Sequence, residues 1–387
     1  MFHIADEDDI RKGRTTDVYF ARTMEVLKAK GVDKLVRAEV IVKSLPGNAP
    51  WAVFTGLEEL AEVVRGLKVR VRAMREGTFI RPYEPVLEIE GMYTDFGALE
   101  TSMLGLICQA SGVATKAARC KKAADGRPVI SFGARRMHPA IAPMVERSAF
   151  VGGWDGVSVI KSAEMIGEEA SGTMPHALIL LMGDTVTAAR AFDEVIDKAV
   201  KRIVLVDTFN DEKVEALRVA EALRERLYAI RLDTPFSRRG NFERILEEVR
   251  WELDLRGFGH VQIYVSGGID EEQMAGLNPH VDGYGVGTTI TNARVLDFAL
   301  DIVEIEGVPL AKRGKMSGSK RVLRCAQCFR DSVVPLEQQG GQCGCGGDWH
   351  DLLVPWYDHG TFLFETEKPQ SMRRFVLDQL EHFGLDQ

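Results

Sequence analysis

The chain has no long hydrophobic run, and this absence argues against a helical membrane protein. No stretch of its 387 residues approaches the length of about 20 apolar residues that a membrane-spanning helix needs. The first residues, MFHIADEDDIRKG, lack an apolar core and a cleavage site, so they do not resemble a signal peptide. We therefore expect no membrane association and a cytoplasmic location.

The chain also lacks an excess of positive charge. Its 49 lysines and arginines are outnumbered by 57 aspartates and glutamates, which gives a formal net charge of −8. This balance argues against general nucleic-acid binding but leaves room for a local basic pocket that holds a phosphorylated metabolite. The composition is otherwise that of a globular protein, and the length predicts two or three domains.

Cysteine is scarce and unevenly distributed. Of the six cysteines, Cys108 and Cys120 lie in an apolar helical region, and the other four fall between residues 325 and 345. This clustering indicates a metal site in a reducing compartment rather than a disulfide framework.

Two changes of pattern divide the chain into three predicted domains. Residues 1–124 contain strand-like runs followed by a long helical stretch, which is typical of an α+β layer domain. Residues 125–307 alternate short strands with helices. Residues 308–387 are basic and turn-rich and then cysteine-rich, which predicts a small appended module.

The middle domain contains six short β-rich runs, most of them separated by a helical segment. They are VISFG, VGGWDGVSV, RIVLVDT, YAIRLDT, VQIYVSGG and DGYGVGT. Repeated strand–helix units predict a parallel sheet, and this many units favour an irregular TIM-like α/β barrel. An open doubly wound sheet would show a similar pattern. In either case the polar residues at the carboxyl ends of the strands are candidates for the active site.

Two of these strand ends are rich in glycine. They are SGGID at 266–270 and GVGT at 285–288, with Gly267, Gly268, Gly287 and Thr288 as the candidate contacts. Unpaired backbone amides in such loops bind anions, and loops on successive strands suit one phosphate monoester. The alternative is that the glycines only form tight turns.

Acidic and basic side chains follow two other strands. Asp207 ends one strand, and Arg231 and Asp233 end the next. Two carboxylates at neighbouring strand ends can coordinate Mg²⁺ or face a cationic transition state. Alternatively, they only cap the helices that follow.

Arg135 and Arg136 follow the run VISFG, where an arginine fork can pair with a substrate carboxylate or phosphate. Adjacent arginines are also common as simple exposed residues.

His176, in GTMPHAL, lies in another glycine-led turn. A histidine there can act as a general acid or base, a phosphate ligand or a phosphoryl acceptor. A lone histidine is more often structural.

The cysteine-rich module has the spacing of a zinc site. Cys325 and Cys328 form a CxxC pair, and after fourteen intervening residues Cys343 and Cys345 form a CxC pair. Two close thiolate pairs on turns predict a tetrahedral structural Zn²⁺ site, in which His350 can replace one cysteine. The alternative is four reduced surface thiols.

Taken in order, seven motifs resemble the nicotinate phosphoribosyltransferase family of type II phosphoribosyltransferases, in an archaeal or bacterial form with a zinc-ribbon-like module. The motifs are TTDVYF, SFGARR, GGWDGVS, GTMPHAL, RLDT, SGGID and GVGT, between residues 15 and 288. The resemblance implies an N-terminal α/β sandwich, an irregular α/β barrel, and a homodimer or higher oligomer with active sites at the interface. It also implies that nicotinate and phosphoribosyl pyrophosphate give nicotinate mononucleotide and pyrophosphate, with Mg²⁺ and coupled ATP hydrolysis.

The resemblance also implies roles for single residues. Tyr19, from the partner subunit, and Phe132 are similar to the aromatic residues that stack on the two faces of the pyridine ring. Arg135 resembles the arginine near the substrate carboxylate. The remaining correspondences are Asp155 near the ring, His176 as the phosphorylated histidine with Thr173 beside it, Arg231 and Asp233 near the ribose and pyrophosphate, and Gly267, Gly268, Gly287 and Thr288 around the 5-phosphate.

Three other functions compete with this interpretation. Nicotinamide enzymes share related motifs in longer chains, and quinolinate enzymes share the architecture, but no DTRKT-like basic strand for a second carboxylate is present here. The more distant alternative is a zinc-ribbon nucleic-acid-binding protein that uses the barrel as a scaffold, which the acidic net charge opposes.

Overall fold

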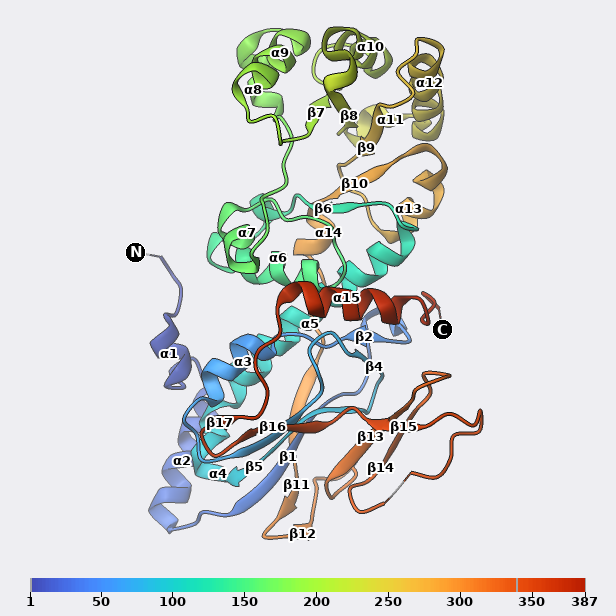
Figure 1. The fold of residues 1–387 in the computed structure, drawn as a ribbon. Coiled ribbons are helices and arrows are strands. Elements are labelled where there is room, and N and C mark those ends of the chain that lie inside the picture. Colours follow the sequence, from blue (N-terminus) through green and yellow to red (C-terminus); the bar gives the residue numbers. More distant parts are fainter. Residues whose placement is uncertain (1, 339, 387) are drawn as a thin grey trace. The chain divides into compact units, whose positions relative to one another are not determined.

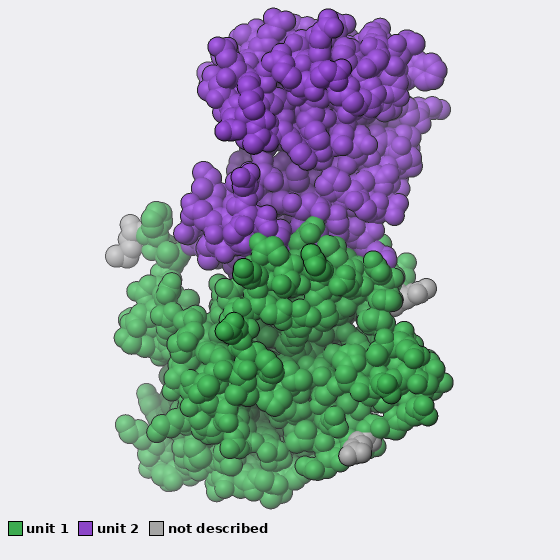
Figure 2. All heavy atoms as spheres, in the orientation of Figure 1, with its two compact units in different colours: residues 1–115, 294–387 green, residues 116–293 purple. Residues whose placement is uncertain are grey.

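A computed structural model describes residues 2–338 and 340–386, and the chain divides into two compact units (Figures 1 and 2). Unit 1 comprises residues 1–115 and 294–387, and unit 2 comprises residues 116–293. The C-terminal residues group with the N-terminal ones because they contribute strands to the same sheet. The division into domains at 124/125 and 307/308 stays a prediction.

Unit 1 is built on a seven-stranded antiparallel sheet. Its strand order is β12-β11-β1-β5-β3-β16-β17. In that order the strands are Val308–Pro309, Phe298–Ile305, Leu35–Val42, Pro85–Met92, Arg70–Ala73, Val354–Asp358 and Thr361–Phe362. Strand β1 lies inside the sheet and pairs with β5 on one side and β11 on the other, so residues as far apart in the sequence as Val36 and Ile305 are neighbours.

Helices cover one face of this sheet and enclose the core of unit 1. Helix α3 (Leu57–Val64) buries Leu57, Leu60 and Val64 at helical spacing, while its glutamates face outward. Helix α5 (Glu100–Ala123) adds Met103 and Ile107 to the same hydrophobic cluster. This arrangement of a sheet layer against a helix layer is the predicted α/β sandwich.

Smaller elements complete unit 1. A three-stranded sheet, β14-β13-β15, carries the cysteine-rich segment, and a two-stranded sheet pairs β2 with β4. The bounds are Lys320–Cys325 for β13, Asp331–Pro335 for β14, Trp349–Asp351 for β15, Ala52–Val53 for β2, Phe79–Ile80 for β4, Glu7–Arg11 for α1, Val18–Lys30 for α2, Tyr93–Phe96 for α4 and Pro369–Leu380 for α15.

Unit 2 is built on a five-stranded parallel sheet with the order β6-β10-β9-β8-β7 (Figure 1). In that order the strands are Val129–Ser131, Gly283–Val286, Gln262–Val265, Leu227–Leu232 and Arg202–Leu205. One isolated parallel bridge, Ile130 to Gly156, extends the β6 edge, and no pairing among the described residues joins that edge to β7. The sheet is therefore a half-barrel, which confirms the predicted α/β class and irregular barrel. Of the six predicted runs, only VGGWDGVSV forms no regular strand.

Helices connect the strands of unit 2, and several begin at the residue types that favour helix starts. Asp211, Asn241 and Asp270 accept hydrogen bonds from backbone amides in the first turns of α10, α12 and α13. The helices are Ala142–Val151 (α6), Ile160–Ile166 (α7), His176–Met182 (α8), Thr185–Val195 (α9), Glu212–Leu223 (α10), Phe236–Arg239 (α11), Phe242–Leu255 (α12), Glu271–Leu277 (α13) and Thr288–Thr291 (α14).

Within residues 2–338 and 340–386, none of the helices combines the length and the apolar character that crossing a membrane demands.

The C-terminal end of the chain is part of the core of unit 1. Phe383 is 3% exposed, and its ring lies 4.8 Å from that of Phe79 and 6.4 Å from that of Trp51, measured between centroids. The Trp51 indole Nε1 donates a 2.7 Å hydrogen bond to the carbonyl of Gly384. The last turn of the chain therefore closes this aromatic cluster.

We expect Phe383→Ala to lower the free energy of unfolding by about 3–5 kcal/mol, because it removes a buried aromatic ring and leaves a cavity. The matched control is Phe364→Ala, whose ring is 59% exposed and whose loss should cost less than about 0.5 kcal/mol. Urea denaturation followed by circular dichroism measures both. Equal effects of the two substitutions would show that the C-terminal turn does not stabilise unit 1.

Candidate active site and metal centre

The carboxyl ends of five parallel strands bring the candidate residues of unit 2 to one edge of the sheet. Phe132 follows β6, Asp207 lies two residues past β7, Asp233 follows β8, Ser266 follows β9 and Gly287 follows β10. Because parallel strands all end at the same edge, residues up to 155 positions apart in the sequence become neighbours. Such an edge is where α/β proteins place their ligands.

The Asp233 carboxylate is the centre of this cluster. Its Oδ1 accepts a 2.7 Å hydrogen bond from the Ser266 hydroxyl, and its Oδ2 lies 3.6 Å from Nε2 of His176 and 3.9 Å from Nη2 of Arg231. Burial alone would raise the pKa of Asp233, but His176 and Ser266 outweigh it and lower that pKa. Asp233 is therefore an ionised carboxylate at neutral pH.

His176, the first residue of α8, points both of its ring nitrogens at polar groups. Nε2 lies near Asp233 and, at 3.9 Å, near Oδ2 of Asp207, while Nδ1 lies 3.1 Å from the Thr208 hydroxyl. Asp233 raises the pKa of His176 against the opposing effect of burial. Carboxylates beside Nε2 favour a proton on that nitrogen, so in the neutral ring Nδ1 carries the lone pair.

One carboxylate oxygen of Asp207 accepts no hydrogen bond from the described residues. Its side chain is only 4% exposed, burial raises its pKa, and its Oδ1 has no hydrogen-bond partner within the described part of the chain. A buried carboxylate oxygen without a partner is costly, so it is expected where a ligand or cation supplies the missing contact.

Arg231 and Phe132 lie together beside the carboxylates. The Arg231 guanidinium donates to the Thr173 hydroxyl, and its central carbon lies 5.1 Å from the Phe132 ring centroid. Burial lowers the pKa of Arg231. A Cβ at Gly285 would lie 2.2 Å from the Phe132 ring, so only glycine at this position leaves room for the ring.

The two glycine loops are joined to each other. The Thr289 hydroxyl donates a 2.6 Å hydrogen bond to the carbonyl of Ile269, which links the end of β10 to the end of β9. Gly267 and Gly268 both have positive φ, at 87° and 73°, and a Cβ at Gly268 would meet no atom within 4 Å. The loop after β9 therefore borders open space and can accept an anion there.

Two predicted site residues are near this cluster but make few contacts. Arg135 and Arg136 form a 3₁₀ turn just after Phe132 and are exposed, with no ion-pair partner among the residues described here. Exposed, unpaired guanidinium groups next to a site suit an anionic ligand.

Asp155 occupies a different position from the other candidates. Its Oδ2 accepts hydrogen bonds from Nζ of Lys121 at 2.7 Å and from the backbone amide of Val129 at 2.9 Å. Val129 is the first residue of β6, so Asp155 lies at the amino end of that strand, away from the end that carries Phe132. These contacts give Asp155 a structural role, and its predicted contact with the ring has no support in this geometry.

Tyr19 belongs to unit 1. It lies on α2 and is 57% exposed, with its ring centroid 4.3 Å from that of Phe20. Its predicted role stays a prediction.

The sequence analysis missed two hydroxyl groups of the site. Thr208, which contacts His176, and Ser266, which contacts Asp233, each lie within three residues of the end of a strand. That position was the available signal. The charged neighbour Asp207 and the glycines after Ser266 form stronger patterns at the same strand ends, and they mask the signal of the two hydroxyls.

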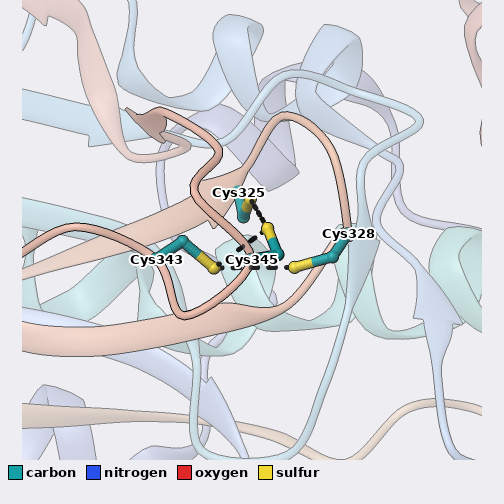
Figure 3. A group of neighbouring side chains, drawn as sticks. All are labelled: Cys325, Cys328, Cys343 and Cys345. Atoms are coloured by element: carbon teal, nitrogen blue, oxygen red, sulfur yellow. Dashed lines mark hydrogen bonds between the residues drawn. The ribbon is translucent and has the colours of Figure 1, made fainter.

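The four clustered cysteines lie together in unit 1, between β13, the turn after it and the segment before β15 (Figure 3). All four sulfurs lie within 4.8 Å of one another, and three of the Sγ–Sγ distances are 3.4, 3.5 and 3.6 Å. Four sulfurs around one zinc at about 2.3 Å would stand roughly 3.8 Å apart, so the spacing fits. A Cβ at Gly347 would lie 2.6 Å from the sulfur of Cys325, so glycine is required there. Among the described residues His350 is not a member of this group.

Comparisons with known proteins agree with this geometry. The family model for the C-terminal domain of quinolinate phosphoribosyl transferase matches residues 113–301, and the model for its N-terminal domain matches residues 17–111. A nicotinate phosphoribosyltransferase of Mycobacterium tuberculosis is 34% identical over 281 residues, which cover 69% of this chain and 61% of the relative. One from Bacillus subtilis is 27% identical over 72% of this chain and 63% of the relative. The chain thus spans less than two thirds of the length of these curated relatives.

Solved structures show the same likeness. The crystal structure of a nicotinate-nucleotide pyrophosphorylase from Pyrococcus furiosus has 54% sequence identity and a TM-score of 0.97, and the match covers 99% of this chain and 98% of that one. Human nicotinic acid phosphoribosyltransferase, at 19% identity and a TM-score of 0.74, shares the fold over 95% of this chain and 94% of its own. The chain therefore belongs to the type II phosphoribosyltransferase family, which includes these nicotinate and quinolinate enzymes.

Proposed function

We propose that this protein joins nicotinate to phosphoribosyl pyrophosphate, forming nicotinate mononucleotide and pyrophosphate, with coupled hydrolysis of ATP. The observation that carries the proposal is the position of His176, with Nε2 within 4 Å of both Asp207 and Asp233 at adjacent strand ends. The names of the curated relatives support the choice of nicotinate.

The arrangement suits displacement at the anomeric carbon of a ribose. This reaction passes through a centre with the positive charge of an oxocarbenium ion, which the ionised Asp233 and the buried Asp207 can stabilise. The loops at Gly267, Gly268 and Gly287 would bind the 5-phosphate and so fix the ribose relative to these carboxylates. Fixed positions of both reactants can lower a barrier by roughly 7–11 kcal/mol at the ideal limit.

His176 would couple the reaction to ATP as the phosphoryl acceptor. With the proton on Nε2, the lone pair on Nδ1 would attack the terminal phosphorus of ATP, and ADP would leave. The Thr208 hydroxyl, 3.1 Å from Nδ1, would give up its hydrogen bond to that lone pair in this step. Arg231 lies beside Asp233 and supplies positive charge for the phosphate groups.

The pyridine ring would lie against Phe132, with its carboxylate near the exposed guanidinium of Arg135 or Arg136. We infer that the second aromatic face is Tyr19 of a second copy of the chain, which would make the functional unit a homodimer. The exposure of Tyr19 supports this role.

Mg²⁺ would bind to Oδ1 of Asp207, a buried oxygen that has no hydrogen-bond partner within the described residues. One or two carboxylates together with substrate phosphates are the usual ligands of Mg²⁺, so a complete set of protein ligands is not required. The ion would neutralise the charge of the leaving pyrophosphate.

We infer that Cys325, Cys328, Cys343 and Cys345 hold a structural Zn²⁺. Four thiolates leave no open position for catalysis, and a small three-stranded sheet gains stability from a metal. Free thiols for this site need a reducing compartment, and this requirement supports a cytoplasmic location for the protein.

Quinolinate is the second candidate substrate because the family models that match the chain are named for quinolinate enzymes. Quinolinate carries a second carboxylate, for which the exposed guanidinium groups of Arg135 and Arg136 are candidate partners. Nicotinamide remains the neutral alternative.

Purified protein mixed with Mg²⁺ and phosphoribosyl pyrophosphate should convert nicotinate to its mononucleotide much faster than nicotinamide or quinolinate. Addition of ATP should increase the yield. Chromatography of the products measures both. Release of carbon dioxide from quinolinate at a comparable rate would instead assign the second candidate.

The pKa of His176 should fall in Asp233→Asn, because this substitution removes the carboxylate that raises it. The neutral imidazole then persists to lower pH, so the acidic limb of the ATP-dependent rate should move to lower pH. In the unmodified protein the raised pKa means that this charge pair stabilises the fold most below the ordinary pKa of 6.5, and the contribution is lost as pH rises through the folded pKa.

Nuclear magnetic resonance of ¹³C-labelled histidine measures that pKa directly, with Asp211→Asn, in the cap of α10, as the control. An unchanged His176 titration in Asp233→Asn would remove Asp233 from the role assigned to it.

Metal analysis of protein purified without chelators should find one zinc per chain. Cys328→Ser should lose the zinc and lower the melting temperature, whereas Cys108→Ser, outside the cluster, should retain it. A metal-free protein whose melting temperature does not respond to a chelator would rule out the site.

A further inference from the structure

One buried arginine contacts the backbone behind the first glycine loop. Arg239 ends the short helix α11 after β8 and is only 7% exposed. Its Nε donates a 2.8 Å hydrogen bond to the carbonyl of Thr234. Its Nη2 donates to the carbonyl of Ser266 at 2.8 Å and also to that of Gly267. A single guanidinium thus joins the segment after β8 to the segment after β9.

These contacts fix the direction of two peptide units. In a trans peptide the carbonyl and the following N–H point in opposite directions, and the described chain contains no cis peptide bond. With the carbonyls of Ser266 and Gly267 turned toward Arg239, the amides of Gly267 and Gly268 must point away from it. Neither amide has a hydrogen-bond partner among the residues that the structure describes.

Space and charge agree with this direction. On the Arg239 side the loop is tightly packed, since a Cβ at Gly267 would lie 3.1 Å from Nη2 of Arg239 and 3.0 Å from Oδ1 of Asp233. A Cβ at Gly268 would meet nothing within 4 Å. A cation bound to a carbonyl also polarises the peptide, which makes the N–H on its far side a stronger donor.

We propose that Arg239 is a positioning residue for phosphate binding, which holds the amides of Gly267 and Gly268 toward the 5-phosphate of the ribose substrate without touching it. The inference rests on the proposed function, because it takes a ribose phosphate as the ligand. A lysine cannot replace Arg239, because one ammonium on a flexible chain cannot hold three carbonyls in the fixed plane of a guanidinium.

The test compares Arg239→Lys with Arg238→Lys, a control at the exposed neighbouring position. Calorimetry first measures the Kd of ribose 5-phosphate for the unmodified protein, and no binding there would reject the proposed function itself. In Arg239→Lys we expect that Kd and the KM of phosphoribosyl pyrophosphate to rise about tenfold or more, the loss of roughly one hydrogen bond to a charged group. The KM of nicotinate in Arg239→Lys should stay within about twofold, because nicotinate does not contact the phosphate loop. All values for Arg238→Lys should also stay within about twofold, because Arg238 does not contact that loop.

A purely structural role would instead lower kcat and stability and leave the two KM values in their original ratio, and that result would overturn the proposal.

A second measurement needs no variant. Labelling glycine with ¹⁵N and the serine carbonyl with ¹³C selects only the amides that follow serine, which are Gly112, Gly172, Gly267 and Gly318. Added ribose 5-phosphate should move the Gly267 amide proton downfield and leave Gly112 and Gly318 unchanged. A Gly267 signal that does not respond in protein that binds ribose 5-phosphate would show that the amide does not face the phosphate, and the proposal would fail.

Discussion

The candidate active site depends on one half-buried carboxylate, that of Asp233. It accepts a hydrogen bond from Ser266 at the end of β9, and it lies within 4 Å of both His176 on α8 and Arg231 in β8. A hydrogen bond to a charged group contributes about 1.5–3 kcal/mol, more than one between neutral groups. Three segments from different parts of unit 2 are therefore oriented by a single anion, and that anion also sets the protonation of the histidine.

Backbone packing sets the rest of the geometry. The Phe132 ring fits only because residue 285 is glycine, and the two glycine loops are held together by the Thr289 hydroxyl. Charged side chains thus define one part of the site and close backbone contacts define the other. Together they would hold a flat ring, a ribose and a phosphate in neighbouring positions, as the proposed pentosyl transfer requires.

Much of the candidate site could be predicted from the sequence, because residues that directly follow parallel strands gather at one edge of the sheet. Once Asp207, Asp233 and Gly267 are recognised as residues that follow strands, their proximity follows from the topology. The grouping of the four cysteines could also be predicted, because the CxxC and CxC spacings are local features of the sequence. The α/β class and the parallel sheet of an irregular barrel followed from the repeated strand–helix pattern, whereas the open edge of that sheet did not.

Other features depend on contacts that a local pattern does not encode. Asp155 follows a glycine-rich run that resembles a strand end, but its carboxylate binds Lys121 and the amide of Val129. The C-terminal residues join unit 1 because β16 pairs with β3, about 280 residues earlier in the chain, and such pairing depends on register rather than composition. The role of Arg239 was also hidden, because its partners are backbone carbonyls.

The most direct measurement is a crystal structure of the protein soaked with nicotinate mononucleotide. We expect the phosphate to lie against the amides of Gly267, Gly268 and Gly287, with the pyridine on the Phe132 ring and the anomeric carbon next to Asp233. A nucleotide bound elsewhere, with these loops empty, would contradict it.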